Sequence, residues 1–137
     1  MAAFTIQSET HKSLSALKSL FEFLEDFKNF NSILPHDKVE NFKFTQSQCS
    51  FHIKGITPMT VKLVEKKQHE FILFTSDGLA KFNFKLKVHF IGEALKNGYC
   101  KVELTGDLNP IIKKMAENAL RQLVNTMALK LSQLQIN

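Results

Sequence analysis

The end of the chain, residues 109–134, has the pattern of one long amphipathic helix. Asn109 is a favoured N-cap residue, and Pro110 suits the first helical position, where a backbone N–H would have no partner. Apolar residues then recur every three or four positions, the period of a helix with one apolar face: Ile112, Met115, Ala116, Ala119, Leu120, Leu123, Met127, Leu131 and Leu134. Such a helix, about 37 Å long at about 1.5 Å per residue, needs a long apolar surface to cover.

The region before this helix predicts a run of antiparallel strands. The clearest is 81–90, where apolar Phe82, Phe84, Leu86, Val88 and Phe90 alternate with polar residues. Further strands are predicted at 39–45, 49–54, 60–66, 71–76 and 99–107, with turns at 46–48, 55–58, 77–78 and 97–98. Segment 71–76 is apolar on both faces, so its register is open. Short turns favour an antiparallel meander with one face exposed to solvent.

The N-terminal part predicts a strand and two helices. A strand is expected at 4–9, followed by a helix that Ser13 caps and whose apolar residues begin with Leu14 and Leu17. A very short helix at 29–34 should end before Pro35, because the residue before proline avoids the helical region.

Composition narrows the function classes. A chain of 137 residues suits one domain, and without an apolar run of membrane-spanning length or a secretory signal we expect a cytoplasmic protein with no membrane insertion. Cys49 and Cys100 read as reduced, buried thiols. The net charge is +5, but the aromatic residues are 13 Phe with 1 Tyr and no Trp, which favours a core over base stacking. No nucleic-acid partner is therefore expected.

The order strand, helix, helix, six strands and long helix is that of the helix-grip fold. Residues 21–30, the pair Leu34-Pro35 and the segment 107–110 also resemble the START-like superfamily, or SRPBCC. The likeness is to its small bacterial members; the superfamily includes polyketide cyclase and lipid transport proteins and birch-pollen-allergen-like proteins. This resemblance implies an α+β fold, β-α-α-β6-α, in which a curved antiparallel sheet wraps around the C-terminal helix. Residues 1–137 would form a single START-like domain.

The same resemblance implies an apolar cavity between sheet and helix, which in the superfamily often holds a lipid, sterol, polyketide or other hydrophobic molecule. The lining residues it assigns here are Phe51, Ile53, Val61, Leu63, Phe82, Phe84, Leu86, Val88, Val102, Leu104, Met115, Leu120, Leu123 and Met127. The alternative is a fully packed core, because 13 Phe could fill the space. Both interpretations stay open at this point.

The sequence assigns no catalytic residue, metal or cofactor. The inward positions are apolar, the five His are scattered, and no phosphate loop or nucleophile motif is present. We therefore expect a protein, monomer or dimer, that binds a small hydrophobic ligand of the lipid, polyketide or quinone class without catalysis. One alternative is a cyclase-like or hydrolase-like enzyme, with Tyr99, Asp77 or Thr75 as contributors. The other is an interaction module that uses a lysine-rich outer sheet face: Lys54, Lys62, Lys85, Lys87, His89 and Lys101.

Overall fold

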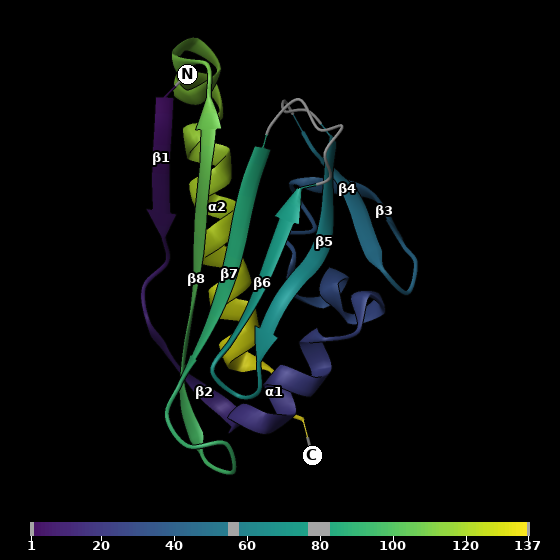
Figure 1. Ribbon diagram of the computed structural model, residues 1–137, viewed down its shortest axis with the longest axis vertical. Helices are drawn as coiled ribbons and strands as arrows, with labels where there is room; N and C mark the ends of the chain where they lie inside the picture. Colours follow the sequence, from purple (N-terminus) through teal and green to yellow (C-terminus); the bar gives the residue numbers. More distant parts are fainter. Residues whose placement is uncertain (1, 55–57, 77–82, 137) are drawn as a thin grey trace.

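The computed structural model describes residues 2–54, 58–76 and 83–136 (Figure 1). Within them, eight strands form one antiparallel sheet in the order β1-β8-β7-β6-β5-β4-β3, and β2 also pairs with β8. The strands are β1 (Ala2–Gln7), β2 (His11–Ala16), β3 (Val39–Phe44), β4 (Gln48–Ile53), β5 (Pro58–Lys67), β6 (Phe71–Ser76), β7 (Asn83–Ile91) and β8 (Asn97–Leu108). The helical elements are α1 (Leu17–Leu24), the 3-10 helix η1 (Phe27–Ile33) and α2 (Pro110–Gln133). This confirms the predicted helix-grip α+β fold.

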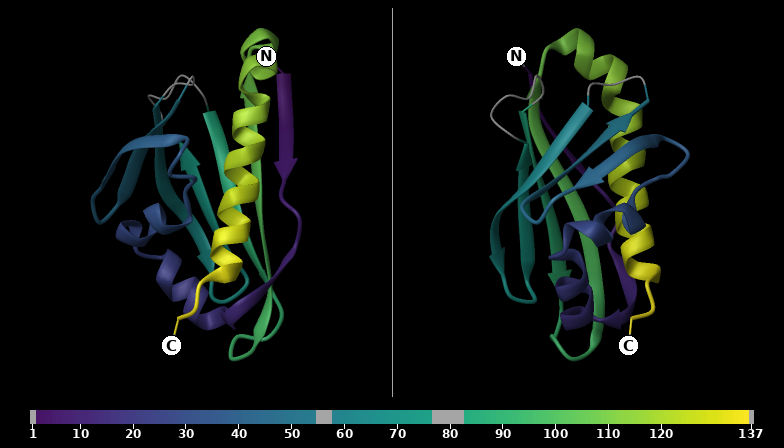
Figure 2. Two further views of the ribbon diagram at one scale, coloured as in Figure 1. Left: turned by 180° about the vertical axis from the view of Figure 1, so that it is seen from behind. Right: turned by 90° about the vertical axis from the view of Figure 1, so that its right-hand side faces the viewer.

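The long helix α2 lies along the concave side of the sheet (Figure 2), where it packs on β8, β2, β1 and η1. The Asn109 side chain accepts a hydrogen bond from the Ile111 N–H at 2.9 Å, so the predicted N-cap is confirmed. At the other end the helix stops at Leu134, as predicted. Within the described residues, no helix has the length and apolar character needed to cross a membrane.

The N-terminal prediction was wrong in one respect. Ser13 does not cap a helix but lies in the second strand, β2, and the helix begins only at Leu17. Both β1 and β2 pair with β8, with a break between them where the Ser8 hydroxyl accepts from the Val102 N–H. The Ser13 hydroxyl accepts a hydrogen bond from the Gly98 N–H at 3.0 Å. It therefore bonds to the neighbouring strand β8 and not to the first turn of a helix. The short helix before Pro35 is confirmed as η1.

The turn between β7 and β8 was also predicted in the wrong place. The sequence put it at 97–98, whereas both residues belong to β8 and the turn spans 92–96, with Gly92 at φ +133°. The predicted turn at 77–78, most of the one at 55–58, and residues Lys81 and Phe82 lie outside the described residues.

The register of the two-faced strand β6 can now be stated. Ile72, Phe74 and Ser76 are buried on the inner face, while Phe71, Leu73 and Thr75 are half-buried on the outer face. The outward Phe71 ring is covered by Lys87, whose Nζ lies 4.4 Å from the ring centre. A bulge in β5 between Leu63 and Glu65 lets the sheet bend next to this strand.

Candidate functional site

The structure brings most of the predicted lining residues together between the sheet and α2. Those that are buried are Phe51, Ile53, Val61, Phe84, Leu86, Val88, Val102, Leu104, Leu120, Leu123 and Met127. Leu63 is half-buried against them, and Phe82 lies outside the described residues. One assignment was wrong: Met115 is 77% exposed. Ile111 and Ile112 in the same first turns of α2 are exposed as well, so the apolar core does not extend to the start of the helix.

Phenyl rings fill the part of this interior that lies under η1. The Phe30 and Phe74 ring centres are 5.4 Å apart in an edge-to-face arrangement, and Phe27 and Phe74 are 5.9 Å apart. Phe30 also stacks on Phe51, with ring centres 6.2 Å apart. Because aromatic pairs at these separations are in contact, the packed-core interpretation holds at the η1 end of the interior.

Outside this cluster, the inner face of the sheet carries mostly aliphatic and methionine side chains, with Phe84 among them. Met59 is buried opposite Phe51, although the sequence assigned position 58 to a break and so missed it. Ser76 is buried beside it in the sheet, and its hydroxyl accepts from the Phe84 N–H at 3.1 Å. Sequence reasoning also missed two buried residues of α2, Val124 and Ala128, although they continue the spacing of four that begins with Ala116 and Leu120.

The two cysteines are free and buried, as predicted. Burial raises the pKa of both Cys49 and Cys100 to about 12. The Cys100 thiol donates to the Ala128 carbonyl of α2 at 3.8 Å. Neither thiol is placed to act as a nucleophile at neutral pH, because the thiolate is the reactive form.

These pKa values give a direct test. At pH 8 we expect both native thiols to react with a water-soluble disulfide reagent at least about 100-fold more slowly than in denaturant, because a pKa near 12 leaves about one thiolate in 10⁴. The release of the coloured thiol product, followed by absorbance with and without guanidinium, measures the ratio. Native labelling at the denatured rate would contradict the burial of both residues.

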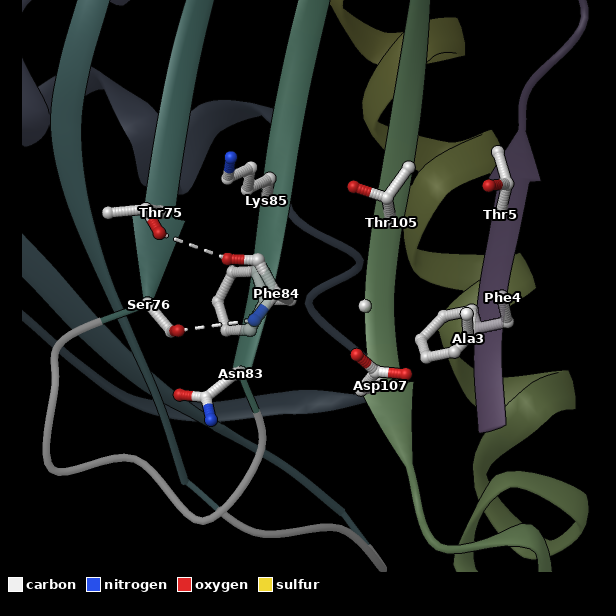
Figure 3. Close-up of a pocket in the computed structure, with 11 residues that line it drawn as sticks. Ala3, Phe4, Thr5, Thr75, Ser76, Asn83, Phe84, Lys85, Thr105 and Asp107 are labelled. Atoms are coloured by element: carbon white, nitrogen blue, oxygen red, sulfur yellow. Dashed lines mark hydrogen bonds between the residues drawn. The ribbon is translucent and has the colours of Figure 1, made fainter. Parts of the chain in front are cut away.

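A hollow of about 480 Å³ lies on the outer face of the sheet, away from α2 (Figure 3). Its floor follows the register Thr75, Lys85, Thr105 and Thr5 across four strands, and Asn83 and Asp107 close one end. The Thr75 hydroxyl donates to the Phe84 carbonyl at 3.2 Å. The hollow is shallow because the threonine side chains are short beside Lys85.

The residues suggested for an enzyme are not brought together. Thr75 lies in the outer hollow opposite Lys85, whereas Tyr99 pairs with Ile91, six positions further along β7, and is half-exposed. Asp77 lies outside the described residues. In the part of the chain that the structure describes, no three His, Cys, Asp or Glu residues are grouped as metal ligands would be.

The lysine-rich outer face is partly neutralised by its neighbours. His89 Nε2 and Glu103 Oε1 are 3.2 Å apart; burial lowers the pKa of His89, against the opposite effect of the Glu103 hydrogen bond. Lys101 Nζ donates to the Gln7 side-chain oxygen at 3.4 Å, and Lys87 covers the Phe71 ring. Lys62 and Lys85 flank Thr75 in the register. The face is therefore a mixed polar surface rather than a continuous cationic one.

Comparison with known proteins identifies the fold. No family model matches the chain, and neither does any curated protein. Among solved structures, a norcoclaurine synthase of Thalictrum has a TM-score of 0.68 at 8% identity, over 96% of this chain and 92% of its own. A protein of Chromobacterium violaceum has a TM-score of 0.63 at 11% identity, over 96% and 99%. The di-domain ARO/CYC protein BexL of the BE-7585A biosynthetic pathway has a TM-score of 0.60 at 15% identity, over 98% of this chain and 51% of its own.

At these identities the likeness concerns the fold. The chain has the predicted helix-grip fold, which it shares with the norcoclaurine synthase and the di-domain ARO/CYC protein.

Proposed function

We propose that the protein binds a small hydrophobic molecule, of the lipid, polyketide or quinone class, between the N-terminal half of α2 and the concave face of the sheet. The observation that carries this proposal is the chemistry of that wall. Its side chains are aliphatic, aromatic or thioether groups, with the Ser76 hydroxyl as a polar exception. The norcoclaurine synthase was solved in complex with a transition-state analogue, which supports a ligand-binding use of the fold. On this proposal residues 1–137 act as one cytoplasmic domain, monomer or dimer.

The apolar wall also limits the charge that the ligand can carry. Binding would remove apolar ligand surface from water, which is worth about 25 cal/mol per Å² before ordering costs. Met59 and Met127 are fully buried, and their unbranched side chains can change rotamer to accept a ring or chain between them. A charged group placed against the same wall would lose its hydration without a partner, at a cost of several kcal/mol. We therefore propose a neutral ligand, or one whose charged end stays at the pocket mouth.

The direct experiment is native mass spectrometry of freshly purified protein before and after organic extraction. A bound small molecule that extraction removes is the expected result, and its mass identifies the class. The extracted protein should then bind a fatty acid, a quinone or an aromatic polyketide added back. The proposal fails if the protein carries no adduct and binds none of the three.

A substitution in α2 tests the position of the pocket. Ala119 is half-buried against the core, so Ala119→Trp adds an indole on the face of α2 that borders the proposed pocket. We expect affinity for an apolar fluorescent probe to fall at least about tenfold, because a buried aromatic side chain occupies about 150–250 Å² of contact surface. Fluorescence titration measures the change.

The matched control is Asn118→Trp, which places the same side chain one position away at an exposed site. It should leave probe affinity unchanged, and circular dichroism should show both variants folded. Equal affinities for the two variants would locate the probe elsewhere and contradict the proposed pocket.

A further inference from the structure

The first turns of α2 carry an apolar group that does not belong to the core. Ile111, Ile112 and Met115 are 71%, 50% and 77% exposed. Scattered exposed apolar residues are normal on a protein surface, whereas three large ones within five positions form a patch that marks an interaction site. We call this patch, together with Lys113 and Lys114, the tip surface.

The residues of the tip surface are arranged in order around the helix. At about 100° per residue, Ile111, Met115 and Ile112 span an arc of about 100°. Lys114 lies about 60° beyond one edge of this arc and Lys113 about 100° beyond the other. An apolar strip flanked by ammonium groups is the pattern of a helix that rests in a membrane interface, where lysine stems reach outward to the headgroups.

One edge of the apolar strip lies on the side of α2 that faces η1. Ile112 lies about five helical turns before Lys130, hence at nearly the same angle around the helix. Lys130 Nζ donates to the Leu34 carbonyl at the end of η1, 2.7 Å away, which fixes that side of α2 as the one facing η1. Ile112 therefore lies on the η1 side of α2, and the rest of the apolar strip extends about 100° around the helix from it.

The position in the fold leaves the tip surface accessible. Figure 2 shows the start of α2 at one extremity of the molecule, opposite the end where the C-terminus lies. A flat surface can approach this extremity without meeting the sheet first. The turn between β7 and β8, at the opposite extremity, would point away from it (Figure 1).

Charge distinguishes the kind of surface that fits. The first turn of α2 contains no acidic residue, and neither Lys113 nor Lys114 takes part in the ion pairs found among the described residues. The first acidic side chain of the helix, Glu117, contacts Arg121 at 3.3 Å. The net charge of the chain is +5. A surface that is apolar beneath a layer of negative charge complements this arrangement, and an anionic lipid bilayer is such a surface.

We propose that the tip surface docks the protein on an anionic lipid membrane, with Ile111, Ile112 and Met115 inserted at the boundary between headgroups and acyl chains. The docked pocket mouth would then exchange its hydrophobic ligand with the bilayer. This purpose rests on the proposed function, whereas docking itself is measured without a ligand.

The test is co-sedimentation of the full chain with vesicles of phosphatidylcholine alone or with 30% phosphatidylglycerol. We expect binding to the anionic vesicles to be at least about tenfold tighter and to weaken as salt rises, because each lysine near an anionic surface adds to the attraction. The double variant Met115→Asp with Ile111→Ser should abolish binding. Lys113→Gln with Lys114→Gln should weaken it about tenfold.

The matched control is Leu95→Asp, because Leu95 is 80% exposed in the turn between β7 and β8. It should bind vesicles as the wild type does. All variants should keep the wild-type melting temperature, since the changed side chains are exposed or, for Lys113, half-buried. The docking proposal is overturned if the wild type does not bind anionic vesicles, or if the double variant with Met115→Asp binds them as tightly as the wild type does. If the protein binds vesicles but takes up no apolar probe, the docking proposal holds and the ligand-binding proposal fails. If it takes up a probe but does not bind vesicles, the ligand-binding proposal holds and the docking proposal fails.

Discussion

Replacing Phe30 with alanine is expected to lower the free energy of unfolding by about 3–5 kcal/mol. Phe30 is 0% exposed and its ring contacts three other phenyl rings, those of Phe27, Phe51 and Phe74. Two of these partners belong to the sheet and one to η1, so the truncation removes the contact by which η1 is held over the sheet. The cavity left behind cannot close easily, because its walls are rigid aromatic rings from separate elements.

Urea denaturation followed by circular dichroism measures the loss. Phe44→Ala is the control, because the same side chain is 52% exposed in β3, and it should cost less than about 1 kcal/mol. A loss at Phe30 no larger than the loss at Phe44 would contradict the aromatic packing described for the η1 end.

The Phe30 cluster also decides where a ligand can lie. If the η1 end of the interior is filled with rings, apolar ligand surface must be received nearer the start of α2, where aliphatic and thioether side chains form the wall. Probe uptake should therefore respond to Ala119→Trp rather than to small changes around Phe30. On the proposed function, one part of the core would hold η1 over the sheet and the other would form the deformable wall that receives the ligand.

Most of the fold could be predicted from the sequence, because the patterns that indicate each helix and strand lie within a few consecutive residues. The alternation in 83–90 and the period of α2 each report which side chains face the core, and the Asn109 cap depends only on residues two positions away. The superfamily resemblance supplied the way these elements combine. The apolar inner wall followed from both.

The errors arose where a residue's partner is distant in sequence. Ser13 has the chemistry of a helix cap, but its hydroxyl bonds to Gly98, which is 85 positions away. Met115 continues the apolar repeat of α2, yet it is exposed, because periodicity gives the angle of a residue and not the point at which the sheet ends beneath the helix. For the same reason, the sequence pattern did not predict that the apolar residues of the tip surface are exposed.

Gly98→Ala is the second substitution with a large expected effect. An unstrained glycine-to-alanine change in a strand should stabilise the fold by about 0.5–1 kcal/mol, because glycine loses more backbone entropy on folding. Here a Cβ would lie 2.5 Å from the Ile91 carbonyl oxygen and 2.8 Å from the Leu17 Cδ1. We expect instead a loss of about 2–3 kcal/mol, since overpacking against backbone forces the strands apart.

The clash cannot be relieved by a side-chain rotation alone. Ile91 is paired with Tyr99 in the β7–β8 ladder, and the Gly98 N–H donates to the Ser13 hydroxyl at 3.0 Å. A shift of β8 would disturb both contacts and move Leu17, the first residue of α1. The neighbouring change Asn97→Ala, at an exposed position, should alter stability by less than about 0.5 kcal/mol, and thermal denaturation compares the two. A Gly98→Ala protein as stable as the wild type would show that β8 does not approach Ile91 of β7 and Leu17 of α1 this closely, and would contradict the packing described for the start of α1.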